Sequence, residues 1–152
     1  MKINTPPGEL VLVTAHPEFG LRDYVLDMAR ETAEATLDKK VVILTRKDLP
    51  LFSHPNICVE NPRITDEIVD CLHATPNIAL AIIEHRILFM RDDDYIVGFT
   101  RKLRLAAETL NIPILVTSEL PDWVVCPETE SLFMEKYSDL DRKIVVKKGL
   151  QT

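Results

Sequence analysis

The residues that could bind a phosphate by type and spacing lie at 15–22, which reads Ala-His-Pro-Glu-Phe-Gly-Leu-Arg. The segment joins an apolar run to a helical pattern, which is the layout of a phosphate-binding loop. A working loop reads GxxxxGK[ST]: backbone N–H groups hold phosphates, the lysine reaches the β/γ-phosphates, and the hydroxyl holds Mg²⁺. Here Gly20 stands at the second glycine, but Leu21 replaces the lysine and Arg22 the hydroxyl residue. The candidate residues of this degenerate nucleotide site are Ala15, Pro17, Gly20, Leu21 and Arg22.

Apolar runs that predict buried strands alternate with helical patterns along the chain. The expected strands are residues 10–13, 41–44, 57–59, 79–83, 114–116 and 144–146. The expected helices cover residues 22–37, a segment with Thr65 as N-cap and an apolar stripe at Ile64, Ile68 and Leu72, and residues 95–110, ended by Asn111 and Pro113. This order predicts one α/β domain over residues 1–152, with a mostly parallel sheet and helices on both faces.

In such sheets ligands bind outside the carboxyl ends of the strands. The expected strand ends are residues 14–20, 45–48, 84–86 and 117–120. Any chemistry is therefore expected in these four segments.

The composition narrows the class of protein. Of the 152 residues, 28% are charged and the formal net charge is −6, which disfavours a surface built for duplex DNA or anionic membranes. The three cysteines form no CxxC pair, so we expect free thiols and a cytoplasmic location. No signal peptide and no run of about 20 apolar residues is present, so no membrane contact is expected.

Several stretches resemble, in order, the ATPase domain of DnaB-type replicative helicases, a branch of the RecA-like fold. The stretch PGELVLVTAHPEFGLRDYVLDMARETA is similar to the opening strand, phosphate loop and amphipathic helix of that family. ICVENPRIT resembles its short strand and Pro-containing turn, and ALAIIEHRILFM its Walker B strand. LRLAAETLNIPILVTSEL resembles the helix and strand of the sensor glutamine, and KIVVKKG the closing strand with the arginine finger. The resemblance covers about residues 7–149 and implies a RecA-like (P-loop NTPase-type) sheet.

The departures from this family fall at positions that carry its chemistry. The residues in place of the phosphate lysine, metal hydroxyl, water-activating glutamate, Walker B aspartate, sensor glutamine and finger arginine are, in that order, Leu21, Arg22, Lys47, Glu84, Glu119 and Gly149. Phosphoryl transfer depends on positioning and charge neutralisation. We therefore expect no catalytic residues, no metal site and no tight binding of ATP or Mg²⁺.

Two charged residues of this region allow more than one interpretation. Arg22 could bind a phosphate at the helix N-terminus, or be a solvated arginine paired with Asp23 or Glu18. Glu84 could be a metal ligand or an acid with a raised pKa, or be paired with Arg46, His85 or Arg86.

Elsewhere, the run Arg91-Asp92-Asp93-Asp94 is expected to cap the helix at 95–110 rather than to bind a metal, because consecutive carboxylates point in different directions. Trp123 is either a partner anchor or a local core residue. His16 has no nucleophile or carboxylate at a readable spacing and is expected to be a surface residue.

These observations favour a non-catalytic RecA-like domain that acts through a protein partner or self-association, in DNA replication or recombination. One alternative is a divergent nucleotide-binding protein or weak ATPase that uses Arg22, Lys47 and a repositioned carboxylate. Another is a nucleic-acid-binding module with a basic tail at Lys143, Lys147 and Lys148, which the acidic balance disfavours.

Overall fold

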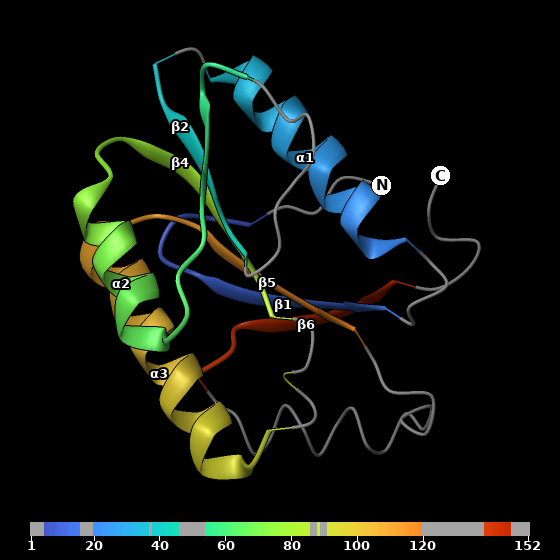
Figure 1. The fold of residues 1–152 in the computed structure, drawn as a ribbon, viewed down its shortest axis with the longest axis vertical. Coiled ribbons are helices and arrows are strands. Elements are labelled where there is room, and N and C mark those ends of the chain that lie inside the picture. Colours follow the sequence, from blue (N-terminus) through green and yellow to red (C-terminus); the bar gives the residue numbers. More distant parts are fainter. Residues whose placement is uncertain are drawn as a thin grey trace.

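Six parallel strands form one sheet with helices on both faces (Figure 1). The computed structural model describes residues 5–15, 20–36, 38–45, 54–85, 88, 91–119 and 139–146. The elements are β1 (Leu10–Ala15), α1 (Leu21–Ala35), β2 (Lys40–Leu44), β3 (Ile57–Glu60), α2 (Thr65–Ala74), β4 (Ile78–Glu84), α3 (Asp93–Leu110), β5 (Ile114–Glu119) and β6 (Arg142–Val146). All six expected strands and all three expected helices are confirmed, with ends that differ by a few residues.

The sheet order is β3-β2-β4-β5-β1-β6, so β1 lies between two strands that follow it late in the chain. Because every pairing is parallel, the carboxyl ends of all strands meet at one edge of the sheet. The segments expected to hold any chemistry begin at this edge.

Two apolar cores cover the sheet, one on each face. α1 packs on one face through Val25, Met28 and Ala29, against strand residues such as Val13 and Ile82. α2 and α3 pack on the other face, and their core residues include Ile68, Leu72, Phe99 and Leu103. Figure 1 shows α1 on one side of the strands and the α2–α3 pair on the other. Strands buried on both faces explain the continuous apolar runs of the sequence.

The start of α2 differs from the expectation by one residue. Ile64, not Thr65, is the N-cap, and its side chain is 57% exposed rather than part of the packed stripe. The nearby carboxylate of Glu67 reaches back and accepts a hydrogen bond from the backbone N–H of Arg63 at 2.8 Å. This bond ties the third residue of α2 to the residue before the N-cap, while Ile64 itself has no side chain that can cap the helix.

Both ends of α3 match the expectation. The side chain of Asp92 accepts a hydrogen bond from the backbone N–H of Tyr95 at 2.8 Å, and Asp93 and Asp94 occupy the first turn, where carboxylates complement the helix dipole. At the other end Asn111 adopts the left-handed conformation, with φ of 53°, and ends the helix.

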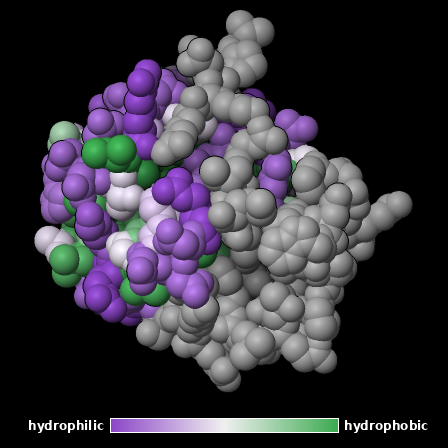
Figure 2. All heavy atoms as spheres, turned by 60° about the horizontal axis from the view of Figure 1, so that its bottom comes forward, coloured by the Kyte–Doolittle hydropathy of each residue, from purple (hydrophilic) through white to green (hydrophobic). Residues whose placement is uncertain are grey.

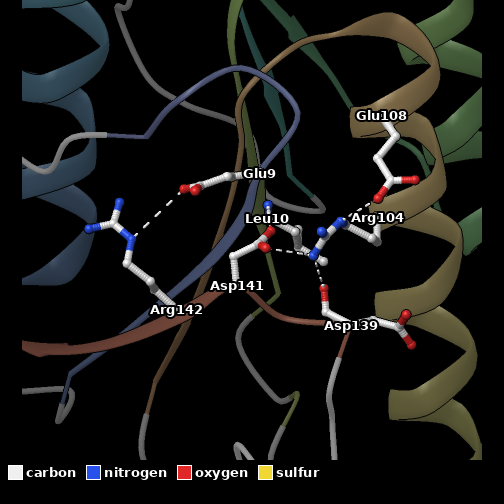
Figure 3. Close-up of polar contacts among 7 residues, drawn as sticks. All are labelled: Glu9, Leu10, Arg104, Glu108, Asp139, Asp141 and Arg142. Atoms are coloured by element: carbon white, nitrogen blue, oxygen red, sulfur yellow. Dashed lines mark hydrogen bonds and ion pairs between the residues drawn. The ribbon is translucent and has the colours of Figure 1, made fainter.

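An acidic side chain next to β6 ties this edge strand to β1 and to α3 (Figure 3). Asp141 accepts one hydrogen bond from the backbone N–H of Leu10 and another from Arg104, both at 2.7 Å. Arg104 also donates to Glu108 and to the backbone carbonyl of Asp139. Burial lowers the pKa of Arg104, but hydrogen bonds and charge from Glu108 and Asp141 outweigh it and hold that pKa above its ordinary value. Arg104 is therefore a permanent cation that fastens β6.

None of the described helices is long and apolar enough to cross a bilayer.

Candidate functional site at the carboxyl edge of the sheet

The register of the strands brings several expected site residues together on the α1 side of the carboxyl edge. Ala15 lies beside Glu119 on β5, and Glu84 lies beside Thr117. Ala15 belongs to the core under α1, and strand side chains alternate between faces, so Glu84 and Glu119 face the same side. Ala15, Glu84 and Glu119 therefore lie at the C-terminal ends of β1, β4 and β5, on the α1 side of the sheet.

Gly20 makes the turn from the loop into α1. It adopts the left-handed conformation with φ of 61° and ψ of 46°, and it is the N-cap of the helix. An added Cβ would meet its nearest atom, Oδ2 of Asp23, at only 3.7 Å, so the requirement for glycine comes from the backbone angle and not from crowding. The glycine expected from the phosphate-loop pattern thus has a conformational reason.

Leu21 does not face a ligand. Its side chain is 8% exposed and belongs to the apolar core between α1 and the sheet. This position therefore contributes packing and no positive charge.

Arg22 and Glu84 interact directly, a pairing that the sequence analysis did not consider. Nη2 of Arg22 lies 3.3 Å from Oε1 of Glu84, and the hydroxyl of Thr45 donates a hydrogen bond to the same oxygen at 2.5 Å. The Glu84 side chain is 13% exposed and that of Arg22 33%. Thr45 is buried and follows β2, so side chains from the start of α1 and from the residue after β2 both hold the carboxylate at the end of β4. The expected partners Glu18, Arg46 and Arg86 lie outside the described residues.

The remaining expected site residues are only partly placed. Ala15 is fully buried and Glu119 is partly buried at the end of β5. Pro17, Lys47 and Gly149 lie outside the described residues, as do His16, Trp123 and the basic pair Lys147 and Lys148. Within the described ranges, no group of three or more His, Cys, Asp or Glu side chains is arranged to hold a metal ion.

A second polar cluster lies on the opposite face of the same edge, and the sequence analysis missed it. Nε2 of His85 is 2.8 Å from the hydroxyl of Tyr95, and the guanidinium carbon of Arg91 lies 3.8 Å from the centre of the Tyr95 ring. Phe99 stacks on the same ring, with centroids 5.8 Å apart. The spacing of Tyr95 and Phe99, four residues apart on α3, was the signal that could have revealed part of it, whereas Arg91 lies before the helix.

Comparisons with known proteins give the fold. No protein-family model and no curated protein sequence matches the chain. Among solved structures, the chain is similar to a DnaB-like replicative helicase that was described together with its interactions with primase, at a TM-score of 0.63 and 13% identity. The similarity covers 78% of this chain and 40% of that chain, so the chain spans well under half of that helicase subunit. The sheet order, the helices and this similarity identify an α/β domain of the RecA-like fold.

Proposed function

We propose that the chain is a non-catalytic RecA-like domain that acts through protein association, in the setting of DNA replication or recombination. The ion pair between Arg22 and Glu84 is the observation that most strongly supports the non-catalytic part of this proposal. In the helicase family that the sequence resembles, these two positions hold the hydroxyl and the carboxylate that would bind Mg²⁺. Here a guanidinium next to the carboxylate supplies the positive charge that the metal would otherwise bring.

This ion pair opposes metal–nucleotide binding in two ways. A divalent ion could reach Glu84 only if Arg22 moved away, and separating this partly exposed ion pair costs about 1–3 kcal/mol, less than for a fully buried one. Thr45 already donates to the same carboxylate oxygen, so that oxygen is engaged twice. Leu21 adds no cation for the phosphates, since it is packed in the core.

The association half of the proposal is supported by the fold. The RecA-like domains that the sequence resembles pair with neighbouring subunits, and this chain keeps their order of strands and helices. The similar solved structure is of a replicative helicase described with primase, which makes a protein of the replication machinery the first class of partner to test. Self-association is the second class.

A divergent nucleotide-binding protein is the alternative from another functional class. It would use Arg22 as a phosphate ligand at the start of α1. The contact of Arg22 with Glu84 disfavours this alternative, because the carboxylate competes for the same guanidinium.

Calorimetric titration with ATP, with and without Mg²⁺, tests the first half. We expect a dissociation constant weaker than about 10 μM, or −7 kcal/mol, in both conditions. Tight binding that depends on Mg²⁺ would favour the nucleotide-binding alternative.

Analytical ultracentrifugation at tens of micromolar tests self-association. A dimer or larger species is expected, and a 17.3 kDa species alone would count against self-association.

A further inference from the structure

A groove lies between α2 and α3, and most of the side chains that line it are exposed to solvent. Its volume is about 580 Å³. α2 connects β3 to β4 and α3 connects β4 to β5, so both helices run antiparallel to the strands and pack side by side (Figure 1). We infer that this groove binds a short amphipathic helix with a basic polar face, supplied by a partner protein. Such a partner deepens the association part of the proposed function, on which this inference rests.

Each helix lines the groove with one stripe of side chains at helical spacing. The stripes are Asp66, Val69, Asp70 and His73 on α2, and Lys102, Leu105, Ala106 and Thr109 on α3. Both follow the spacing i, i+3, i+4 and i+7, which places four side chains on one face of a helix. Two such ridges side by side leave a channel that accepts the side chains of a third helix. Each stripe is roughly 10 Å long, so the occupant needs about two to three helical turns.

The middle of the groove is apolar although it faces solvent. Ala106 is buried, Val69 is partly buried, and the side chain of Leu105 is 63% exposed. Leu105 belongs to neither of the two apolar cores that cover the sheet. Figure 2 shows that hydrophilic side chains dominate the side where α2 and α3 lie, with apolar side chains in small patches among them. A helix with a narrow apolar stripe matches this surface, because helix-in-groove recognition uses a few apolar anchors at helical spacing.

The charges of the groove favour a basic occupant over an acidic one. Lys102 forms an ion pair with Asp66, with Nζ and Oδ1 2.7 Å apart, so these two side chains offset each other. Asp70 forms no ion pair within the part of the chain that the structure describes. The pKa of the Cys71 thiol is raised first by burial and then by the carboxylates of Glu60, Asp70 and Glu67, so α2 carries a negative field. A lysine or arginine on the occupant would therefore find a carboxylate at the rim.

A second copy of the chain matches the groove less well than a basic helix does. The formal net charge is −6, and two copies that packed groove against groove would bring Asp66 and Asp70 near the same residues of the other copy. Like charges placed opposite one another oppose association. Self-association is therefore expected through a different surface.

Fluorescence anisotropy with a designed peptide tests this assignment on the whole chain. The probe is a labelled peptide of about 14 residues, with leucines at i, i+3, i+4 and i+7, lysines beside them and alanines elsewhere. We expect saturable binding with a dissociation constant on the order of 100 μM, and amide shifts in ¹H–¹⁵N spectra centred on residues 66–73 and 102–109. Two control peptides should bind at least about tenfold more weakly: one with glutamates in place of the lysines, and one with the same composition but no leucine stripe.

Two pairs of variants separate the groove from general stickiness or charge. Leu105→Ser should weaken binding of the lysine peptide about five- to tenfold, whereas Ile64→Ser should not, although Ile64 is also exposed, at 57%. Asp70→Lys should weaken it several-fold and improve binding of the glutamate peptide. Glu34→Lys makes the same charge change at an exposed position of α1, on the other face of the sheet, and should do neither. All four residues are exposed, and circular dichroism confirms that the variants fold.

The assignment is overturned if binding does not saturate by about 1 mM, or if the members of either variant pair behave alike. It is also overturned if a control peptide binds as well as the probe. If Leu105→Ser abolished self-association, a second copy would occupy the groove, and the basic helix would be the wrong partner. A chain that dimerises but binds no peptide would refute this inference alone, whereas tight binding of ATP would refute the non-catalytic proposal alone.

Discussion

The guanidinium of Arg22, in the first turn of α1, lies 3.3 Å from the carboxylate of Glu84 at the end of β4. The two residues are 62 positions apart (84 − 22) and belong to different elements, so their contact fastens the start of a helix to the centre of the sheet. The partial exposure of Arg22, at 33%, reduces the free energy that this ion pair can contribute.

Arg22→Met should lower the free energy of unfolding by about 1–3 kcal/mol, below the range for fully buried pairs, because Glu84 would lose its cation. Glu84→Gln should cost a similar amount. The double variant should cost less than the sum of the two, since the residues interact. Urea denaturation measures all three. Asp23→Asn, an exposed neighbour in the same turn, is the control and should change stability by no more than about 0.5 kcal/mol. Additive costs would show that Arg22 and Glu84 are not coupled.

Restoring the phosphate-loop residues should not restore ATP hydrolysis. Leu21→Lys with Arg22→Thr removes the cation next to Glu84 and still leaves Lys47 where the resemblance places a water-activating glutamate. Because Leu21 is 8% exposed, the new lysine should also destabilise the fold by about 2 kcal/mol or more. Phosphate release assays on the folded variant measure turnover. Steady ATP turnover by this variant would contradict the conclusion that the chain lacks residues needed for hydrolysis beyond positions 21 and 22.

Asp141→Ala should destabilise the fold by about 2–4 kcal/mol, because both Arg104 and the backbone N–H of Leu10 lose their acceptor. Asp141→Asn should cost about half as much, since an amide oxygen can still accept one of the two bonds. Glu108→Ala removes the 55% exposed partner of Arg104 and should cost about 0.5 kcal/mol. Thermal unfolding of the three variants compares them. Equal costs for Asp141→Ala and Glu108→Ala would refute the role of Asp141 in holding β6.

Asp92→Ala should cost about 1 kcal/mol, because the backbone N–H of Tyr95 loses the side-chain acceptor that caps α3. Asp92→Asn should restore most of that loss, since asparagine is also a good N-cap. Chemical denaturation of the two variants gives the difference. If alanine and asparagine were equally destabilising, the charge at position 92 would matter and the cap would not.

Cys71 should resist alkylation in the folded protein. Burial, followed by the nearby carboxylates of Glu60, Asp70 and Glu67, raises the pKa of its thiol. A raised pKa in the folded state favours folding below the ordinary thiol pKa, and this contribution is lost as the pH rises through the folded value. With Cys58→Ser and Cys126→Ser in place, the iodoacetamide rate of Cys71 should rise at higher pH in the folded protein than in urea. Coincident pH profiles would contradict this.

The sequence predicted the sheet and helices well because strands buried on both faces produce continuous apolar runs that little else in this chain resembles. It also predicted the positions of Gly20 at the start of α1 and of Asp92 at the start of α3, because each residue affects only the backbone next to it. It did not predict that Leu21 packs in the core, although a leucine in a helix next to a buried strand has that as its commonest environment.

The contacts between side chains were harder to predict than the elements. Arg22 was expected to pair with Asp23 or Glu18, and Glu84 with Arg46, His85 or Arg86. The pairing of Arg22 with Glu84 depends on α1 packing over β4, which the apolar core between them fixes. The stacking of Arg91 on Tyr95 was local and had a visible spacing, but the acidic residues between them drew the interpretation toward helix capping alone.

The position of β1 in the sheet has a consequence for the newly made chain. β1 is synthesised first, yet it pairs with β5 and β6, and the N–H of Leu10 bonds a carboxylate 131 residues later. Until those residues leave the ribosome, the apolar side chains of Leu10, Val11 and Leu12 have no strand beside them. Pairings of such long sequence separation slow folding and leave exposed strands open to aggregation. The protein should therefore depend on chaperones during synthesis more than a helical bundle of equal length.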